Sequence, residues 1–342
     1  MRTLQVGRLT AKPGQRVSGF VQIEGAELEI PVTLICGRKE GETALISGGL
    51  HNAEYVGIQA AMELADEIDP EEIRGNLIII RLLNRTGFEH RTMSVVYEDG
   101  KNLNRIFPGN LSGTLGDKIA YTMEHVFLEK ADYFIDLHSG DGFERLVSYV
   151  YYAAAAKPEV REKARAMAEV AHVQYMVGSM TASGGAYNYA AGALDIPSIL
   201  LERGSNSVWC QDEVREDKHD VLNILRFLGI LEGKVHRHGT GPISVDPVIY
   251  EEAGHSGCWY PTKQPGETFR KGEVLGRICD YFGNELEVCC ARRDGIMLYE
   301  TVSLCIMEGT PMVAYGKWDV EKNGMIEREC LVCGGHRHEH GE

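Results

Sequence analysis

Four continuous apolar runs, each ending in or closely followed by a polar or ionisable residue, constrain the fold of this chain more than any other feature. They are TALISGG, NLIIIRLLN, ADYFIDLH and IPSILLE, at residues 43–49, 76–84, 131–138 and 196–202. Runs of this length are typical of strands that are covered on both faces. Segments with helical spacing follow them, at residues 53–68, 116–130, 158–173 and 212–231. Alternating strands and helices predict an α/β domain built on a mostly parallel sheet flanked by helices.

The two ends of the chain have a different pattern. Residues 16–36 alternate and are rich in β-branched side chains, which predicts antiparallel strands. After residues 232–242, short strand-like segments alternate with Gly and Pro turns, as in a small all-β domain. We therefore expect three parts. They are a large domain at 1–235, into which strands at 1–40 lead, a small β domain at 236–318, and a flexible tail at 319–342.

Composition excludes several classes of function. The formal net charge of −15 argues against general binding to nucleic acid or to anionic membranes, which requires basic surfaces. The sequence contains no run of about 18 apolar residues, so it predicts no membrane span. The first residues lack the apolar core of a signal peptide, so we expect a cytoplasmic protein whose nine cysteines are reduced thiols.

The stretch ISGGLHNAEYVG at residues 46–57 contains the first chemical signal. His51 follows a predicted strand, and Glu54 stands at the start of a predicted helix, where residues three apart share a face. A lone His-x-x-Glu is weak evidence, and a buried histidine is its ordinary explanation. However, His138 and Glu202 end two other predicted strands, and the carboxyl ends of such strands meet at one edge of an α/β sheet.

This combination favours a metal site. Two histidines and one carboxylate, from His51, Glu54 and His138, leave one position of a tetrahedral zinc open, as in catalytic rather than structural sites. Asp136 lies two residues before His138 and shares its strand face, where it either supports the ligand or is a solvated or capping acid.

Four motifs in this order resemble the succinylglutamate desuccinylase/aspartoacylase family, whose members are relatives of the zinc carboxypeptidases. The motifs are GGLHNAE, NLNRIFPG at 102–109, DLHSG at 136–140 and PSILLERG at 197–204. The resemblance covers roughly residues 1–315. It implies a carboxypeptidase-like α/β fold with one zinc per chain that hydrolyses an N-acyl amide or peptide-like bond.

The resemblance also implies roles for individual residues. His51, Glu54 and His138 match the zinc ligands, and Glu202 matches the general base and acid. Asn104 and Arg105 match the pair that holds the substrate carboxylate, while Arg91 resembles the arginine that polarises the scissile carbonyl; a guanidinium suits both tasks. The alternatives without a catalytic role are surface ion pairs for Arg91 and Arg105 and an ordinary strand-end acid for Glu202.

Some positions depart from the family pattern. Asn52 and Ala53 replace the usual Gly-Asn or Gly-Asp between the first histidine and the glutamate, and Asn102 replaces an aspartate that orients a zinc histidine. A neutral amide there predicts a slightly weaker His51 ligand. We find no basic residue that marks the second carboxylate pocket of an aspartoacylase or desuccinylase, which leaves the substrate open.

Three further segments leave alternatives. The glycine-containing segment 184–197 is typical of a mobile loop, in which Tyr187 and Tyr189 either line the pocket or, more simply, pack. The small β domain has lipoyl-carrier-like glycine spacing, but its expected hairpin tips, 281–284 and 292–294, contain no lysine, so it serves instead as a lid or an oligomer contact. The tail has metal-ligand spacing, which predicts either metal handling or disorder. The tail residues concerned are Cys330, Cys333, His336, His338 and His340.

The sequence thus predicts a zinc-dependent amide hydrolase, a deacylase acting on a small N-acyl amino acid or related amide that bears a carboxylate. A homo-oligomer is compatible with the small β domain. The alternatives are a carboxypeptidase or peptidoglycan amidase, and a non-catalytic zinc- or ligand-binding protein with the same fold.

Overall fold

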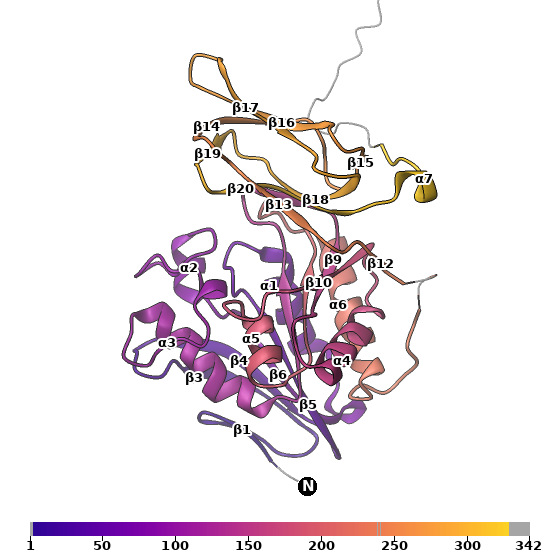
Figure 1. Cartoon of the computed structure of the whole chain (residues 1–342). Helices are drawn as coiled ribbons and strands as arrows, with labels where there is room; N and C mark the ends of the chain where they lie inside the picture. The colour runs from indigo at the N-terminus through magenta and orange to yellow at the C-terminus, as the bar shows by residue number, and fades with distance from the viewer. Residues whose placement is uncertain (1–2, 238, 240, 328–342) are drawn as a thin grey trace, which may run out of the picture. The chain divides into compact units, whose positions relative to one another are not determined.

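The computed structural model describes residues 3–237, 239 and 241–327. Its contacts divide the chain into two compact units, and the division falls between Pro247 and Val248. The domain ranges expected from composition remain a proposal. Each unit is described here by itself (Figure 1).

The first unit alternates strands and helices along the chain. Its strands are β1 (Leu4–Val6), β2 (Leu9–Ala11), β3 (Gln15–Gln22), β4 (Glu29–Cys36), β5 (Lys39–Gly48), β6 (Arg74–Ile80), β7 (Tyr133–His138), β8 (Glu144–Leu146), β9 (Tyr149–Ala153), β10 (Tyr175–Ser179), β11 (Ser198–Glu202) and β12 (Ile243–Ser244). Its helices are α1 (Tyr55–Glu67), α2 (Arg85–His90), α3 (Leu115–Thr122), α4 (Pro158–Ala168), α5 (Ala186–Ala193) and α6 (Gln211–Phe227). A 3-10 turn, η2, covers Leu103–Arg105.

Nine strands form one mixed sheet in the order β12-β10-β9-β11-β7-β5-β6-β4-β3. The central strands β11, β7, β5 and β6 are mutually parallel. The antiparallel pair β3 and β4 extends one side of the sheet, as residues 16–36 predict. The antiparallel pairing of β9 with β11 makes the sheet mixed on its other side. The α/β fold class expected from the sequence is confirmed.

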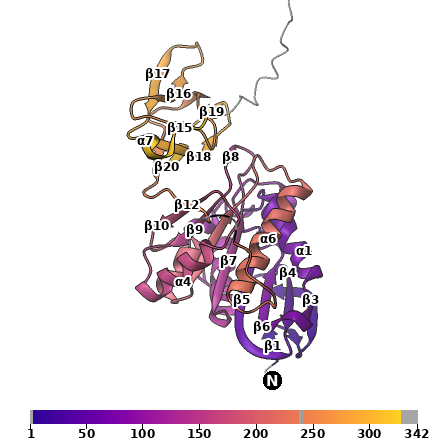
Figure 2. The same ribbon diagram turned by 90° about the vertical axis from the view of Figure 1, so that its right-hand side faces the viewer.

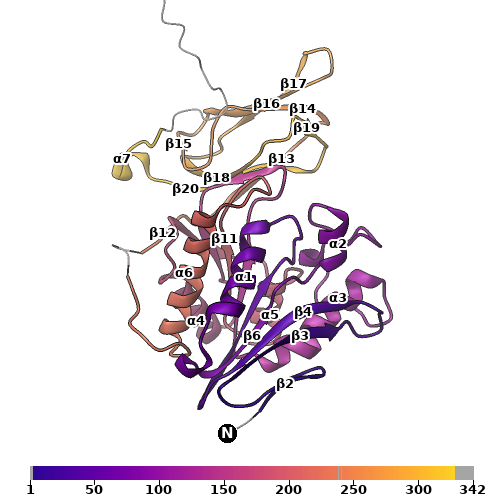
Figure 3. The same cartoon turned by 180° about the vertical axis from the view of Figure 1, so that it is seen from behind.

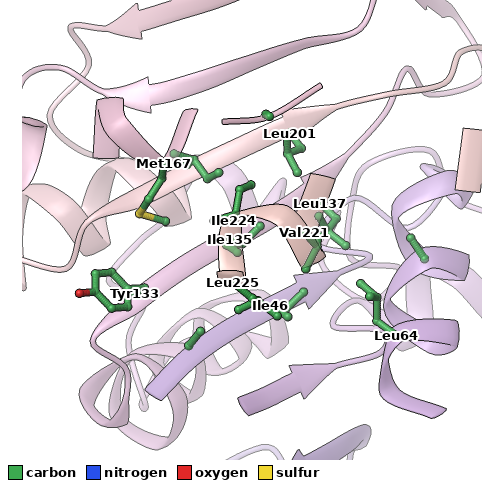
Figure 4. Close-up of a cluster of buried hydrophobic side chains, with 14 of the residues drawn as sticks. Ile46, Leu64, Tyr133, Ile135, Leu137, Met167, Leu201, Val221, Ile224 and Leu225 are labelled. Atoms are coloured by element: carbon green, nitrogen blue, oxygen red, sulfur yellow. The ribbon is translucent and has the colours of Figure 1, made fainter. Parts of the chain in front are cut away.

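Helices cover both faces of this sheet, because successive side chains of its central strands point to opposite faces. In β5, Ala44 and Ile46 pack in a core with α1, α4 and α6, while Leu45 packs in the other core with α3 and α5. Figure 4 shows side chains of the first core, including Ile46, Ile135 and Leu225. Figure 2 turns α4 and α6 toward the viewer, and Figure 3 shows α1 beside α6.

The second unit is a β structure with its own core. Its strands are β13 (Ile249–Glu252), β14 (Gly257–Pro261), β15 (Thr268–Phe269), β16 (Val274–Cys279), β17 (Glu285–Cys290), β18 (Gly295–Thr301), β19 (Cys305–Ile306) and β20 (Pro311–Lys317), and a short helix, α7, covers Val320–Asn323. Two sheets, with the orders β13-β20-β18-β15 and β17-β16-β14-β19, share a core that includes Trp259, Phe269 and Tyr315. A hairpin joins β16 to β17 at the tip expected for 281–284, whereas the turn at 292–294 leads from β17 to β18 in the other sheet.

Three segments differ from the sequence predictions. The expected mobile loop at 184–197 contains α5, and strands β9 and β10 occupy residues to which no strand was assigned. Residues 319–327, placed in the tail, include α7, and Thr268 donates its backbone N–H to Ile326. The cysteine- and histidine-rich residues 330–340 lie outside the described residues. Within the described chain, no helix has the length and apolarity needed to cross a membrane.

Candidate active site

The site residues gather where three parallel strands end. Glu202, the last residue of β11, is the register partner of His138, the last residue of β7. Gly48, the last residue of the neighbouring strand β5, pairs with Leu137. His51 follows β5 after a short turn, so all three ends deliver polar side chains to one edge of the sheet, as the sequence predicts.

Two glycines shape the turn between β5 and His51. Gly49 has a φ of +70°, a conformation that favours glycine, and a Cβ there would lie 2.6 Å from Cδ1 of Leu82. A Cβ on Gly48 would lie 2.9 Å from Cβ of Ala61, because α1 packs closely against the strand end. Glu54 then occupies the N-cap position of α1, so this candidate metal ligand lies at the start of the helix.

His51, Glu54 and His138 form one cluster of ligand atoms. Oε1 of Glu54 lies 2.6 Å from Nδ1 of His51, and its Oε2 lies 2.9 Å from Nδ1 of His138. One ligand atom from each residue lies within 4.8 Å of the others. The His51 side chain is 12% exposed, against 2% for His138, so the cluster opens to solvent on the His51 side.

The chemistry of this donor set fits zinc. Both imidazoles turn Nδ1 toward the shared carboxylate, and an oxygen faces each remaining ring nitrogen. Oδ1 of Asn102 lies 3.0 Å from Nε2 of His51, and Oδ2 of Asp136 lies 3.2 Å from Nε2 of His138, outside hydrogen-bonding angles. Outer oxygens that hold ligand histidines in this way are usual around zinc. The geometry therefore favours the supporting role for Asp136 over a solvated acid.

The charges in the cluster are tightly coupled. Burial alone would raise the pKa of Glu54, but His138 and His51 outweigh it and bring the pKa to about 2. Burial acts to lower the pKa of His138, whereas Glu54 and Asp136 raise it well above its ordinary value. The ionised carboxylate of Glu54 thus favours a proton on the buried imidazole of His138, and a divalent cation could replace that proton.

Glu202 lies beside this cluster and is half-buried. Burial raises its pKa well above the ordinary value, the charge of Glu54 adds to the rise, and His138 opposes it. The chain is held firmly just after it. Arg203 donates its backbone N–H to His138 and its guanidinium to Asp220, at 3.1 Å and 2.7 Å. This anchoring fixes the direction of the Glu202 side chain.

Asn104 and Arg105 lie on the η2 turn. Asn104 is buried, and its Oδ1 accepts the backbone N–H of Ala186 at the start of α5. Among the described residues, its Nδ2 has no hydrogen-bond partner. The side chain of Arg105 is exposed and, among the described residues, donates only to the carbonyl of Asn104, at 2.9 Å. The Oδ1 and the carbonyl of Asn104 therefore make structural contacts. The Nδ2 of Asn104 and the remaining N–H groups of Arg105 are available to a ligand.

Arg91 ends helix α2 with a left-handed backbone conformation, at a φ of 56°. Its side chain is exposed, and no contact of it with the cluster is recorded. The two residues that follow it are hydrogen-bonded to Asn52 and Ala53, which lie between His51 and Glu54. Asn52 donates its side-chain N–H to the carbonyl of Thr92, and Ala53 donates its backbone N–H to Met93. Arg91 thus starts a segment that is attached to the site.

Sequence reasoning missed two roles. Asn52, noted only as a departure from the family pattern, is buried and accepts from Asn84, which links two strand ends. Glu144 is the first residue of β8, shortly after β7, and no motif marked it. Burial raises its pKa to about 8, and Asp141 and Glu54 add to the rise. The available signal was its place only a few residues after a ligand-bearing strand end.

The two tyrosines of α5 have packing roles. Tyr187 is buried in the core that contains α3 and α5. The hydroxyl of Tyr189 donates to Glu124 at 2.9 Å. The packing interpretation of the sequence is therefore the better one for both.

A second group of residues that could hold a metal ion lies elsewhere in the described structure. Glu124, His125 and Glu129 bring their ligand atoms within 4.8 Å of one another, after the end of α3. His125 and Glu129 are a helical pair joined at 2.6 Å, and Glu124 accepts from Tyr189. These ordinary contacts account for the group without an ion.

Comparison with known proteins gives a consistent picture. A family model described as the succinylglutamate desuccinylase/aspartoacylase catalytic domain matches residues 40–228. An N-alpha-acetyl-L-2,4-diaminobutyric acid deacetylase from Halomonas elongata is 27% identical over 276 residues, which cover 78% of this chain and 80% of that protein.

Solved structures agree over most of their length. The product-bound structure of the ectoine utilization protein EutE (DoeB) from Ruegeria pomeroyi has a TM-score of 0.80 and 25% identity, covering 90% of this chain and 96% of that one. A succinylglutamate desuccinylase/aspartoacylase from Rhodobacter sphaeroides gives a TM-score of 0.80 and 25% identity, covering 90% and 97%.

Proposed function

Since this chain belongs to the succinylglutamate desuccinylase/aspartoacylase family of amide-hydrolysing deacylases, we propose that it removes an acyl group from a small N-acyl amino acid in a zinc-dependent reaction. The observation that carries the proposal is the convergence of His51, Glu54 and His138 at the sheet edge where Glu202, half-buried, ends the neighbouring strand. A structural zinc site would not need a base at that strand end.

The three ligand residues would hold one zinc ion per chain. When bound there, zinc would supply Lewis-acid activation of a water molecule and of the amide carbonyl. Asn102 and Asp136 support this assignment, because each holds an oxygen near the imidazole nitrogen that faces away from Glu54.

Glu202 is the proton carrier in this proposal. A water that attacks the amide carbon must lose a proton, and the leaving nitrogen must gain one. A single carboxyl can accept the first proton and donate the second when its pKa lies near the working pH. The raised pKa of Glu202 supports this role, because burial makes the carboxyl a stronger base than an exposed glutamate.

Asn104 and Arg105 bind the carboxylate of the substrate in this proposal. The guanidinium of Arg105 can make a bidentate contact with a carboxylate, and Nδ2 of Asn104 can add a neutral donor. Arg91 is assigned to the carbonyl oxygen, where a fixed positive charge stabilises the tetrahedral oxyanion. The next two residues, Thr92 and Met93, accept hydrogen bonds from Asn52 and Ala53, which supports that placement.

The named substrate of the Halomonas elongata relative suggests where to begin. N-alpha-acetyl-L-2,4-diaminobutyric acid is an N-acetyl amino acid with a free carboxylate and a second amine. We take N-acetyl amino acids as the first class to test.

The test is a turnover assay on metal-free and zinc-loaded protein. The panel contains N-acetyl and N-succinyl amino acids, C-terminal dipeptides and a muramoyl peptide, with release of the free amine as the readout. We expect release from N-acetyl amino acids by the zinc-loaded protein alone. Release from peptides only would support a carboxypeptidase or amidase, and no release by zinc-loaded protein would support a binding protein.

A further inference from the structure

Three cysteines form one rung across three neighbouring strands of the second unit. The strand register places Cys258 on β14 opposite Cys305 on β19 and, on its other side, opposite Cys279 on β16. Residues that are opposite each other in adjacent strands project to the same face of the sheet. The three thiols therefore lie side by side on one face of the sheet β17-β16-β14-β19.

This face of the sheet points away from the core of the second unit. Trp259, Ile278 and Ile306, which are chain neighbours of the three cysteines, all pack in that core. Because successive side chains of a strand alternate between the two faces, the cysteines project to the opposite face. Cys305 is exposed, Cys258 is half-buried and Cys279 is buried. A small reagent in solution therefore meets the rung first at Cys305.

Backbone hydrogen bonds distinguish the two cysteine pairs of the rung. Trp259 donates its backbone N–H to the carbonyl of Leu304 at 2.7 Å, one rung beyond the pair of Cys258 and Cys305. Hydrogen-bonded and non-hydrogen-bonded rungs alternate between antiparallel strands, so Cys258 and Cys305 form a non-hydrogen-bonded rung. The Cα atoms of such a rung are about 4.5 Å apart, and its side chains approach most closely. This separation lies within the range of about 4.4–6.8 Å that disulfides span.

Two other cysteines of the same sheet lack this combination of access and an opposing thiol. Cys289 packs in the core, and burial raises its pKa to about 12, so it stays a protonated thiol. Cys290 is exposed, but the residue opposite it on β16 is Val274. Exposure alone thus does not single out Cys305, whereas the thiol of Cys258 across the rung does.

We propose that Cys258 and Cys305 are a modification site, at which a low-molecular-weight disulfide such as glutathione disulfide converts the two thiols into a cross-strand disulfide. The thiolate of Cys305 attacks one sulfur of glutathione disulfide, whose S–S bond breaks and releases one glutathione. The thiolate of Cys258 then attacks Sγ of Cys305 and releases the second glutathione. The two protein thiols are oxidised, the reagent is reduced to two glutathiones, and these take up the two thiol protons.

The bond would act on the edge of the sheet. β19 contains only Cys305 and Ile306 and is the outermost strand beside β14. A disulfide would fasten this edge strand to its neighbour. Disulfides that form in reducing surroundings are usually transient, and excess glutathione should reverse this one. The site would therefore respond to the redox state around the protein, independently of the proposed hydrolytic function.

Peptide mapping of the full-length protein tests this. The protein is incubated with glutathione disulfide, its remaining thiols are alkylated, and tryptic peptides are analysed by mass spectrometry without reductant. Cleavage after Lys and Arg leaves Cys258 as the one cysteine of peptide 238–263 and Cys305 as the one cysteine of peptide 294–317. We expect the main oxidised product of the wild type to link these two peptides, and excess reduced glutathione to restore both thiols.

Cys258→Ser separates the two steps of the reaction. In this variant Cys305 should keep one glutathione, because no thiol is left opposite it to displace the adduct. Cys290 is the matched control in the same sheet, and the oxidant is raised until fragmentation of peptide 278–292 shows an adduct on it. The adduct on Cys290 should be equal in the wild type and in Cys258→Ser, since Val274 lies opposite it.

Three results would overturn the proposal. The first is a stable glutathione adduct on Cys305 of the wild type without a link to Cys258. The second is a link from peptide 238–263 to peptide 278–292, which would show that Cys258 reacts with a cysteine of β16 or β17 instead. The third is a free thiol at Cys305 when Cys290 is modified. A link that excess glutathione leaves intact would show a permanent disulfide and contradict the redox response.

Discussion

Glu202 and His138 are register partners at the last rung of two parallel strands. The pairing of β11 with β7 runs from Ser198 opposite Phe134 to Glu202 opposite His138. Partners in a sheet project to the same face, and the rung before them, Leu201 and Leu137, is buried in the core. The proposed base and a ligand residue are therefore fixed relative to each other by the central sheet.

The first prediction concerns the metal. His51→Ala and His138→Ala each remove one of three ligands, so each should lower zinc content from about one ion per chain to a small fraction after dialysis. Metal analysis by mass spectrometry measures this. His125→Ala is the control, because His125 belongs to the other ligand-type group. Full zinc occupancy in both of the first two variants would disprove the ligand assignment.

The strands and the ligand cluster could be predicted because the relevant signals are local. Continuous apolar runs identify central strands, and a polar residue at the end of each run marks the sheet edge. The segment 184–197 was misread because its glycines hid a run of helix-forming alanines. The start of helix α5 is held by the side chain of Asn104, about 80 residues earlier in the chain, and no local pattern contains that contact.

The second prediction concerns Arg105. Arg105→Ala should weaken binding of substrates with a free carboxylate on the order of 30-fold or more, and affect their neutral primary amides little, because only the acid gains from a guanidinium. Values of KM and kcat/KM for matched acids and amides measure this. Arg85→Ala provides the comparison, since Arg85 is paired with Glu89 on the surface of α2. Similar losses on acid and amide would show that Arg105 does not bind the carboxylate.

The third prediction concerns stability and pH. Asp217 on α6 is fully buried, and neither carboxyl oxygen has a hydrogen-bond partner in the described structure. Burial raises its pKa to about 8, and Asp220 adds to the rise although Arg203 opposes it. The folded protein thus holds a proton on Asp217 that the unfolded chain releases near its ordinary pKa of about 4. The contribution of Asp217 to the free energy of unfolding is greatest below pH 4 and is lost as the pH rises to about 8.

Asp217→Asn removes this dependence, because an amide stays neutral. We expect the variant to be more stable than the wild type at pH 8, by about 1–3 kcal/mol, the usual cost of an unsatisfied buried polar group. The two proteins should be nearly equal in stability at pH 4.5. Urea unfolding at both pH values gives the two differences. A variant that is less stable at pH 8 would show that Asp217 is ionised and paired in the folded protein.

The last prediction is that Glu202 carries the proton transfers. Glu202→Gln keeps the size and position of the side chain at the end of β11 and removes its ability to accept a proton. We expect kcat to fall by about 10²–10⁴, the usual effect of losing a positioned acid–base group. Zinc content and KM should change little, because Glu202 is assigned neither to the metal nor to the substrate carboxylate. Glu213→Gln, which removes a partly exposed acid 3.8 Å from Arg203, serves as the control and should keep wild-type turnover. Retained turnover in Glu202→Gln, or loss of its zinc, would show that Glu202 is not the base.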